Sequence, residues 1–304
     1  MLNIPSEFNI IVEKAKASSK PWRVAVAGAD NENILKGVFA AQEAGFAEPI
    51  LIGSFKKTKA MLEEIGLAGR DYDFYPVTDN TSPVQYAIEM IQAGSADVLM
   101  RGNIQTRDFL LPVLNKANHL IREGSLVTHI NVQKLPFYDR LIAVSDCTLL
   151  VQPSVEQREK VVQNMTEALL QFGIRKPNIA LLALVEKPSF HMKDTVEAQT
   201  IVMRHQEEPL ADCQLYGPIA YDLIMSKDAA RLKHFDCKAC GEFDGIVVPN
   251  LMAGNLICKV WDTHLGAIGS GVLAGTTIPI ALSGRATSPE SAFLSLTGSI
   301  AMFV

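Results

Sequence analysis

Short apolar runs alternate with amphipathic segments along almost the whole chain. The runs that predict buried strands lie at 23–28, 49–53, 97–100, 126–131, 141–145, 179–185, 245–249 and 278–282. Most are separated by about 10–15 residues in which apolar side chains follow helical spacing. Such connections are right-handed crossovers that place neighbouring strands parallel. The sequence therefore predicts an α/β fold with mostly parallel sheets.

The last third of the chain shows this alternation in detail. We expect a strand at 245–249, a polar turn at 250–255 and a helix from about 256 to 265. The glycine-rich stretch 266–277 is predicted to be a flexible connection between domains. It contains a G-x-G-x-x-A string, but that string does not follow a strand and open a helix, so it is not a dinucleotide fingerprint. A strand at 278–282 then leads into the loop 283–288, and Ser288-Pro289 opens a last helix.

Length and composition narrow the class of protein. A chain of 304 residues with 48% hydrophobic residues predicts two globular domains. The net charge of −5 argues against nucleic acid or an anionic membrane as a partner. No apolar run has the length of a membrane span, and the first residues lack a signal-peptide pattern, so a cytoplasmic protein is expected.

The five cysteines are an odd number, which argues against a disulfide framework. Cys237 and Cys240 have the spacing of a zinc-binding pair, and His234 precedes them. A structural zinc site needs four ligands, and the chain has no second pair at suitable spacing. We therefore predict a polar turn with reduced thiols and no metal site.

Three loops are predicted to form an anion site. Ligands of parallel α/β sheets bind beyond the carboxyl ends of the strands, which selects the loops 101–106, 250–255 and 283–288. The first turn of a helix offers free N–H groups and a partial positive charge, both of which favour phosphate. Arg285 adds a planar guanidinium between a buried strand and a helix start. Together these features favour a phosphate pocket.

Several other polar residues have two interpretations. His129, beside Thr128, could donate to a substrate or be a satisfied core histidine. Asp146 and Asp222 could be buried functional carboxylates or turn residues. The sequence alone leaves these alternatives open.

The chain also resembles the phosphate acetyl/butyryltransferase family along nearly its whole length. The segments that carry the resemblance follow one another in the family's order; they are 102–106 (GNIQT), 109–116, 138–146 (YDRLIAVSD), 153–157 (PSVEQ), 217–222 (GPIAYD), 249–255 (PNLMAGN) with Lys259, and 279–288 (PIALSGRATS). The segments 109–116 and 138–146 are closer to the phosphate butyryltransferase branch.

This resemblance implies reversible transfer of an acyl group, in which acyl-CoA and phosphate give acyl phosphate and coenzyme A. It implies an isocitrate dehydrogenase-like fold of two αβα domains with the active site in the cleft between them, and a homodimer. We expect residues 1–138 with 283–304 to form the first domain and 139–282 the second. Acyl-CoA and inorganic phosphate are the expected partners. No metal or redox cofactor is implied, since coenzyme A is itself substrate or product.

The resemblance also nominates site residues. Arg285, Ser283 and Glu290 are the candidate catalytic residues. The candidates for binding phosphate or acyl-CoA are Gly102, Asn103, Thr106, Thr128, His129, Asn250, Gly254, Asn255, Gly284, Thr287 and Ser288.

The chain departs from the family pattern at a few positions. Gly284 replaces the usual serine before the arginine, and the position of a proposed catalytic aspartate falls near Ser291, beside Glu290. These departures leave a non-catalytic protein that binds CoA esters or phosphorylated metabolites as the alternative. A decarboxylating dehydrogenase of the same fold would need paired metal-binding aspartates and a nucleotide loop, and neither is found in the sequence.

Overall fold

The computed structural model describes residues 2–77 and 81–304. The chain divides into two compact units: unit 1 comprises Met1–Val127 and Ile268–Val304, and unit 2 comprises Thr128–Ala267. The predicted domain boundaries follow residues 138 and 282, whereas the boundaries between the two units follow residues 127 and 267. The difference has a cause in strand pairing. The predicted boundary after residue 138 would divide the antiparallel pair β5–β6, which unit 2 keeps intact, and the one after residue 282 would separate β11 from its parallel partner β4 in unit 1.

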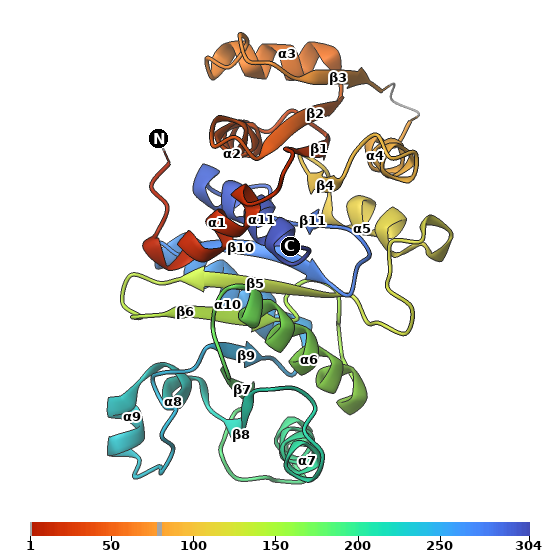
Figure 1. Ribbon diagram of the computed structural model, residues 1–304. Helices are drawn as coiled ribbons and strands as arrows, with labels where there is room; N and C mark the ends of the chain where they lie inside the picture. The colour runs from red at the N-terminus through yellow and green to blue at the C-terminus, as the bar shows by residue number, and fades with distance from the viewer. Residues whose placement is uncertain (1, 78–80) are drawn as a thin grey trace. The chain divides into compact units, whose positions relative to one another are not determined.

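Unit 1 contains a six-stranded portion of sheet (Figure 1). Its strands are β1 (Trp22–Ala27), β2 (Ala47–Gly53), β3 (Asp73–Pro76), β4 (Val98–Arg101), β10 (Ile268–Ala274) and β11 (Ile280–Ala281). Their order is β3-β2-β1-β4-β11-β10, and every neighbouring pair is parallel except β10 with β11. The helices are η1 (Ser6–Phe8), α1 (Asn9–Lys16), α2 (Glu32–Glu43), α3 (Phe55–Glu64), α4 (Pro83–Gln92), α5 (Thr106–Leu114), η2 (Lys116–Asn118) and α11 (Pro289–Ala301).

Unit 2 repeats this plan with five strands. They are β5 (Thr128–Lys134), β6 (Leu141–Ser145), β7 (Asn178–Leu182), β8 (Gln214–Ile219) and β9 (Gly245–Val247), in the order β5-β6-β9-β7-β8. Only β5 and β6 are antiparallel. The helices are α6 (Val155–Gln171), α7 (Lys193–Glu207), α8 (Tyr221–Met225), α9 (Lys227–Leu232) and α10 (Leu251–His264). The predicted α/β class with mostly parallel strands is thus confirmed.

Capping residues begin several of the helices. Ser82 and Ser154 accept hydrogen bonds from the backbone N–H three residues later, and Ser154 with Gln157 forms a complete capping box. Asn31 caps α2 and Ser288 caps α11 in the same way. Thr106 is different: it is the first residue of α5, and Gln105 occupies the cap position without a side-chain bond.

Two predictions in the last third of the chain are wrong. The stretch 266–277 is not a flexible link, because it contains the buried strand β10. Its small residues let α11 approach closely: Ser270 Oγ donates to the Leu294 carbonyl at 2.9 Å, and the N–H of Gly271 donates to Ser295 Oγ at 2.9 Å. The helix predicted from about 256 begins at Leu251, because Asn250 accepts the Ala253 N–H and caps it.

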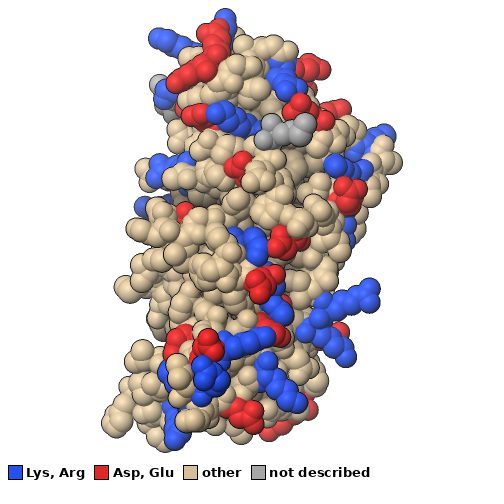
Figure 2. Space-filling view, turned by 90° about the vertical axis from the view of Figure 1, so that its left-hand side faces the viewer, with Lys and Arg blue, Asp and Glu red and all other residues tan. Residues whose placement is uncertain are grey.

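The surface carries both signs of charge. On the face shown in Figure 2, lysine and arginine side chains are interspersed with aspartate and glutamate, in keeping with the small net charge. Among the described helices, none combines the length and the apolar character needed to cross a bilayer.

Candidate functional site

The carboxyl ends of β1, β4 and β11 meet at one edge of unit 1, because these three strands are parallel. Arg101, the last residue of β4, joins two of the predicted loops there. Its Nε and Nη2 donate to the Ile104 carbonyl at 2.8 and 2.6 Å, and its Nη1 donates to the Ser283 carbonyl at 3.1 Å. The structure therefore brings the loops 101–106 and 283–288 together.

Two asparagines of α2 fix the second loop through its main chain. Asn31 Nδ2 donates to the Arg285 carbonyl at 2.9 Å, and Asn33 Nδ2 donates to the Thr287 carbonyl at 2.8 Å. Asn31 uses its other side-chain atom, Oδ1, to accept from Ile34 N and cap the helix. The carbonyls of this loop are thereby held toward α2.

The first loop is fixed by a very close approach of two backbones. The N–H of Gly102 donates to the Ala27 carbonyl at 2.8 Å, and that of Asn103 donates to the Gly28 carbonyl at 2.7 Å. A Cβ on Gly102 would lie only 2.1 Å from the Gly28 carbonyl oxygen, so only glycine fits. The backbone N–H groups of Gly102 and Asn103 are therefore used in hydrogen bonds within the protein. The side chain of Asn103, which is exposed, and that of Thr106, which is half-buried, are available to a ligand at this edge.

The second loop keeps free donors. Its Thr287 N–H is bonded to the Gly284 carbonyl at 3.1 Å, so this amide is not available to a ligand. Within the described part of the chain, the N–H groups of Arg285 and Ala286 have no hydrogen-bond acceptor. Successive free amides of this kind form a concavity that suits an anion.

Two guanidinium groups dominate the charge at this edge. Arg101 is 5% exposed, whereas Arg285 is exposed. Burial lowers the pKa of Arg101 to about 10, and the nearby positive charge of Arg285 contributes to the shift. Among the residues that the structure describes, no carboxylate forms an ion pair with either arginine. A buried cation beside a second cation is costly unless an anion binds to them.

The other candidates of unit 1 lie around these arginines. Ser283 is buried and contributes its carbonyl to Arg101, and Gly284 is exposed, with no atom within 4 Å of a built Cβ. Ser288 uses its hydroxyl as the cap of α11, accepting from Ser291 N at 3.1 Å. Glu290 is half-buried in the first turn of the same helix.

In unit 2, the start of α10 packs tightly on the segment after β6. A Cβ on Gly254 would lie 2.6 Å from the Asp146 carbonyl oxygen, so this glycine permits the contact. Asn255 Nδ2 donates to the Cys147 carbonyl at 3.3 Å. Asn250 is the cap residue described above, so all three of these predicted binding residues contribute to how α10 is held.

Asp146 is a buried acceptor of backbone amides. Its Oδ2 accepts from His129 N at 2.7 Å, and its Oδ1 accepts from the N–H groups of Thr148, Leu149 and Leu150 at 2.8, 2.6 and 3.2 Å. Four N–H bonds satisfy the carboxylate and fix the loop after β6. This geometry favours a structural role for Asp146. Asp222 instead forms an ion pair with Lys233 at 2.8 Å.

His129 and Thr128 are both buried within unit 2. His129 Nδ1 lies 2.7 Å from Thr148 Oγ1 and 3.1 Å from Cys147 Sγ. Thr128 is fully buried, and its hydroxyl accepts from Asn164 Nδ2 at 2.9 Å. Of the two interpretations left open by the sequence, these contacts favour a satisfied core histidine.

Sequence reasoning missed Arg101 and Asn33. Arg101 lay inside a selected loop but was not chosen, although an arginine that ends a fully apolar strand is a signal of a buried charge with a partner. Asn33 gave no such signal, since a polar residue in the first turn of a helix is common. Its partner, the Thr287 carbonyl, is distant in the sequence.

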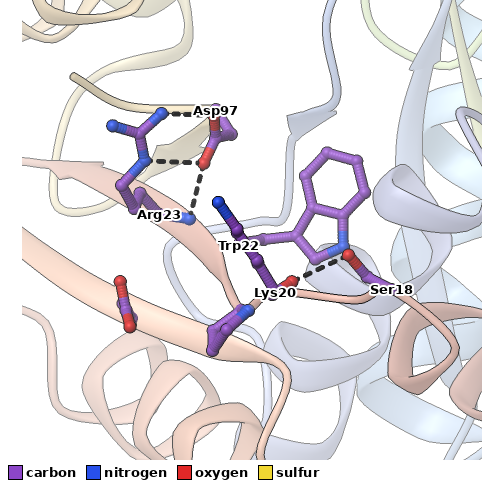
Figure 3. A pocket seen from close by; sticks show the side chains of 7 residues that line it. Ser18, Lys20, Trp22, Arg23 and Asp97 are labelled. Atoms are coloured by element: carbon purple, nitrogen blue, oxygen red, sulfur yellow. Dashed lines mark hydrogen bonds and ion pairs between the residues drawn. The ribbon is translucent and has the colours of Figure 1, made fainter. Parts of the chain in front are cut away.

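A pocket of about 720 Å³ lies at the opposite, amino edge of unit 1. Its lining includes Lys20, Trp22 and Arg23, and Figure 3 shows the guanidinium of Arg23 bonded to Asp97. In parallel α/β sheets the ligand edge is the carboxyl edge, so we place the candidate site at Arg101 and Arg285. No cluster of three metal-ligating side chains is found in residues 2–77 and 81–304.

The chain is similar to known proteins along most of its length. The family model described as phosphate acetyl/butaryl transferase matches residues 77–296. The phosphate butyryltransferase of Clostridium acetobutylicum is 30% identical over 284 residues, covering 93% of this chain and 94% of the relative. The phosphate acetyltransferase of Thermotoga maritima is 25% identical over 286 residues, covering 94% and 96%. A branched-chain phosphotransacylase from Enterococcus faecalis shares the fold, with a TM-score of 0.79 at 24% identity over 92% of this chain and 98% of that one.

Proposed function

Because the chain belongs to the phosphate acetyl/butyryltransferase family, we propose that it is a phosphate acyltransferase that converts acyl-CoA and phosphate into acyl phosphate and coenzyme A, and the reverse. Relatives at 25–30% identity along nearly the whole chain support this class of reaction. Butyryl or another short acyl group is the proposed substrate, in line with the names of the relatives that match at 30% identity.

The observation that carries the proposal is the pair of arginines at the carboxyl edge of unit 1, neither of which has a carboxylate partner among the residues that the structure describes. A phosphate dianion would neutralise both charges and accept from the free N–H groups of Arg285 and Ala286. Arg285, with a planar fork of donors, can bind two phosphate oxygens at once. Arg101 would act mainly through its charge and by holding the loops in register.

The chemistry follows from this binding mode. A phosphate oxygen attacks the thioester carbonyl carbon, a tetrahedral oxyanion forms, and the C–S bond breaks to release the coenzyme A thiolate. The thiolate then takes up a proton, since a free thiol has a pKa of about 8.5. Fixed donors that hold the phosphate reduce the entropy cost of bringing two substrates together, and fixed positive charge stabilises the negative charge that develops.

Other parts of the proposal rest on the family alone. Coenzyme A takes part as substrate or product, and the reaction as written needs no redox cofactor. Catalytic roles for Ser283 and Glu290, substrate contacts from Asn255 and Thr106, and a homodimer remain proposals. Light scattering of the purified protein measures the last of these directly.

A thiol-release assay across a series of acyl-CoA substrates tests the function. Release of free coenzyme A should require phosphate or arsenate and should be fastest for one short acyl group. Each additional methylene that the protein buries contributes about 0.8 kcal/mol of binding free energy, so we expect the rate to change gradually along the series. Tight coenzyme A binding by calorimetry without release from any acyl-CoA would instead favour the non-catalytic binding protein.

A further inference from the structure

The turn that connects α9 to β9 carries two cysteines, at positions 237 and 240, with two residues between them. The N–H of Cys240 donates to the Cys237 carbonyl at 3.3 Å, which closes a tight turn. In such a turn the first and fourth Cα atoms lie within about 7 Å, close to the range that a disulfide spans. The backbone therefore already holds the two residues near bonding geometry.

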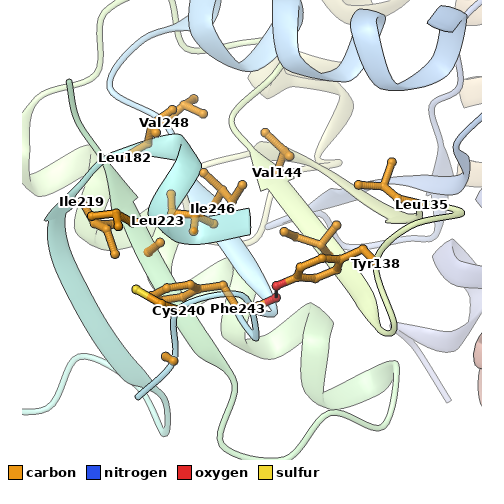
Figure 4. Packing of buried hydrophobic residues seen from close by; sticks show 14 of the residues in the cluster. Leu135, Tyr138, Val144, Leu182, Ile219, Leu223, Cys240, Phe243, Ile246 and Val248 are labelled. Carbon is orange, nitrogen blue, oxygen red and sulfur yellow. Dashed lines mark hydrogen bonds between the residues drawn. The ribbon is translucent and has the colours of Figure 1, made fainter. Parts of the chain in front are cut away.

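The two thiols differ in exposure. Cys237 is half-buried and lines a pocket of about 410 Å³ together with Tyr216, Phe235 and Lys238. Cys240 is 3% exposed and belongs to the buried cluster of unit 2, where Figure 4 shows it beside Phe243. Cys237 is thus the more accessible of the two residues, and Cys240 is the buried one.

The residues after Cys240 anchor the turn to α8 and close a second turn. The N–H of Gly241 donates to the Ile224 carbonyl at the end of α8 at 3.1 Å, and that of Glu242 donates to the Ala239 carbonyl at 2.8 Å. Burial and a hydrogen bond with the Cys237 thiol raise the pKa of Cys240 to about 12. Both thiols are reduced, as all five cysteines of this structure are.

We propose that Cys237 and Cys240 form a reversible intramolecular disulfide by exchange with a low-molecular-weight disulfide. A metal site is not favoured, because within the described residues no third ligand joins the pair. A cysteine pair of this spacing is typical of redox motifs in α/β proteins, and the disulfides found in cytosolic proteins are usually transient. The assignment does not rest on the acyltransferase function.

The exchange has two balanced steps. Cys237 loses its proton to solvent, and its thiolate attacks one sulfur of the external disulfide, releasing one small thiolate that takes up a proton. Cys240 then loses its proton and attacks the Cys237 sulfur, and the second small thiolate leaves and is protonated. The two protein sulfurs are oxidised, and the external disulfide is reduced to two thiols. The high pKa of the buried thiol makes the second step faster as pH rises.

The remaining cysteines serve as internal controls. Cys147 and Cys258 are both buried, and a hydrogen bond with the Cys258 thiol together with burial raises the pKa of Cys147. Cys213 is buried as well. A small disulfide can reach none of these three from solvent without local opening of unit 2, so the exchange should be selective for the turn.

Peptide mapping after treatment with oxidised glutathione tests the proposal. Trypsin cuts after Lys238, between the two cysteines, so the disulfide would join peptide 234–238 to peptide 239–259. Because the second peptide also contains Cys258, the experiment uses the folded Cys258→Ser variant, with remaining thiols alkylated before digestion.

We expect the chain to lose the mass of two hydrogen atoms, and the two peptides to be linked until a reductant is added. Cys240→Ser should instead accumulate one glutathione adduct on Cys237, and Cys237→Ser should show neither product. Two results would overturn the assignment. One is full alkylation of Cys237 after treatment, and the other is an adduct on Cys237 that persists at pH 9 without closing onto Cys240.

Discussion

The guanidinium of Arg101 donates to the Ser283 carbonyl, 3.1 Å away, and so ties the end of β4 to the end of β11. The same group donates twice to the Ile104 carbonyl, so one side chain fixes both loops of the candidate site. Its bonds use only carbonyl acceptors, which leaves the positive charge without a counterion among the described residues. The residue therefore positions the loops and adds to the field that attracts an anion.

Replacing Arg101 with lysine should separate these two roles. Lysine keeps the charge but cannot present three N–H groups in a planar fork to two carbonyls. Each lost hydrogen bond costs about 1 kcal/mol, so we expect a loss of stability of about 1–3 kcal/mol and a higher KM for phosphate. Urea unfolding and initial rates measure these quantities. An unchanged KM for phosphate would show that the loop register set by Arg101 is irrelevant to binding.

Phosphate should stabilise the folded protein. A ligand that binds only the folded state at ten times its Kd adds about 1.4 kcal/mol of stability, which raises the Tm. We expect a rise for the wild type in phosphate relative to chloride at equal ionic strength, and a smaller one for Arg101→Met. Differential scanning calorimetry compares the two. Equal rises for both proteins would place the phosphate elsewhere.

Substitution of two glycines of the site should affect the stability of the protein to very different extents. Gly102→Ala pushes a Cβ to 2.1 Å from the Gly28 carbonyl oxygen, which should cost about 1–3 kcal/mol or more and displace the loop. Gly284→Ser meets no atom within 4 Å and restores the serine found in the family pattern, so stability should change by less than about 0.5 kcal/mol. The denaturant midpoints of Gly102→Ala and Gly284→Ser, each compared with the wild type, measure these changes. A strongly destabilised Gly284→Ser protein would contradict the prediction.

The ion pair at the amino edge of unit 1 should contribute to stability in a pH-dependent manner. Hydrogen bonding from Arg23 lowers the pKa of Asp97 below 3.8, its ordinary value. A carboxyl whose folded pKa is lowered stabilises the fold above its unfolded pKa and loses that effect as pH falls through the folded pKa. Asp97→Asn should therefore cost about 1 kcal/mol at pH 7, after allowance for solvent screening, and less at pH 2. Urea unfolding at both pH values measures this difference in stability between the wild type and Asp97→Asn. If the difference is the same at pH 7 and pH 2, the ion pair is not its cause.

The fold class followed from local patterns, because apolar runs and capping residues act over a few residues. Ser82, Ser154 and Ser288, for example, cap the helices that directly follow them. The stretch 266–277 was misjudged for a reason that is not local. Its glycines and serines suit a strand only because α11 packs closely on it, with Ser295 as a hydrogen-bond partner 24 residues away.

The candidate site was predictable in outline but not in its contacts. The carboxyl-end rule selected the loops of Arg101 and Arg285, since it needs only the strand order. It could not show that the amides of Gly102 and Asn103 are used by the fold, because their acceptors lie in a loop about 75 residues earlier. The burial of His129 and Thr128 likewise depends on packing within unit 2.

The kinetics of Arg285→Ala test the central claim most directly. The substitution removes an exposed guanidinium but keeps the main-chain carbonyl that Asn31 holds, so the loop and the Tm should be preserved. Arg70→Ala, which removes another exposed arginine of unit 1, serves as the control. If Arg285 binds the phosphoryl group in the transition state, kcat/KM for phosphate-dependent coenzyme A release falls by about 100-fold or more, while the control keeps its activity. Equal kcat/KM values for Arg285→Ala and the wild type would contradict the claim.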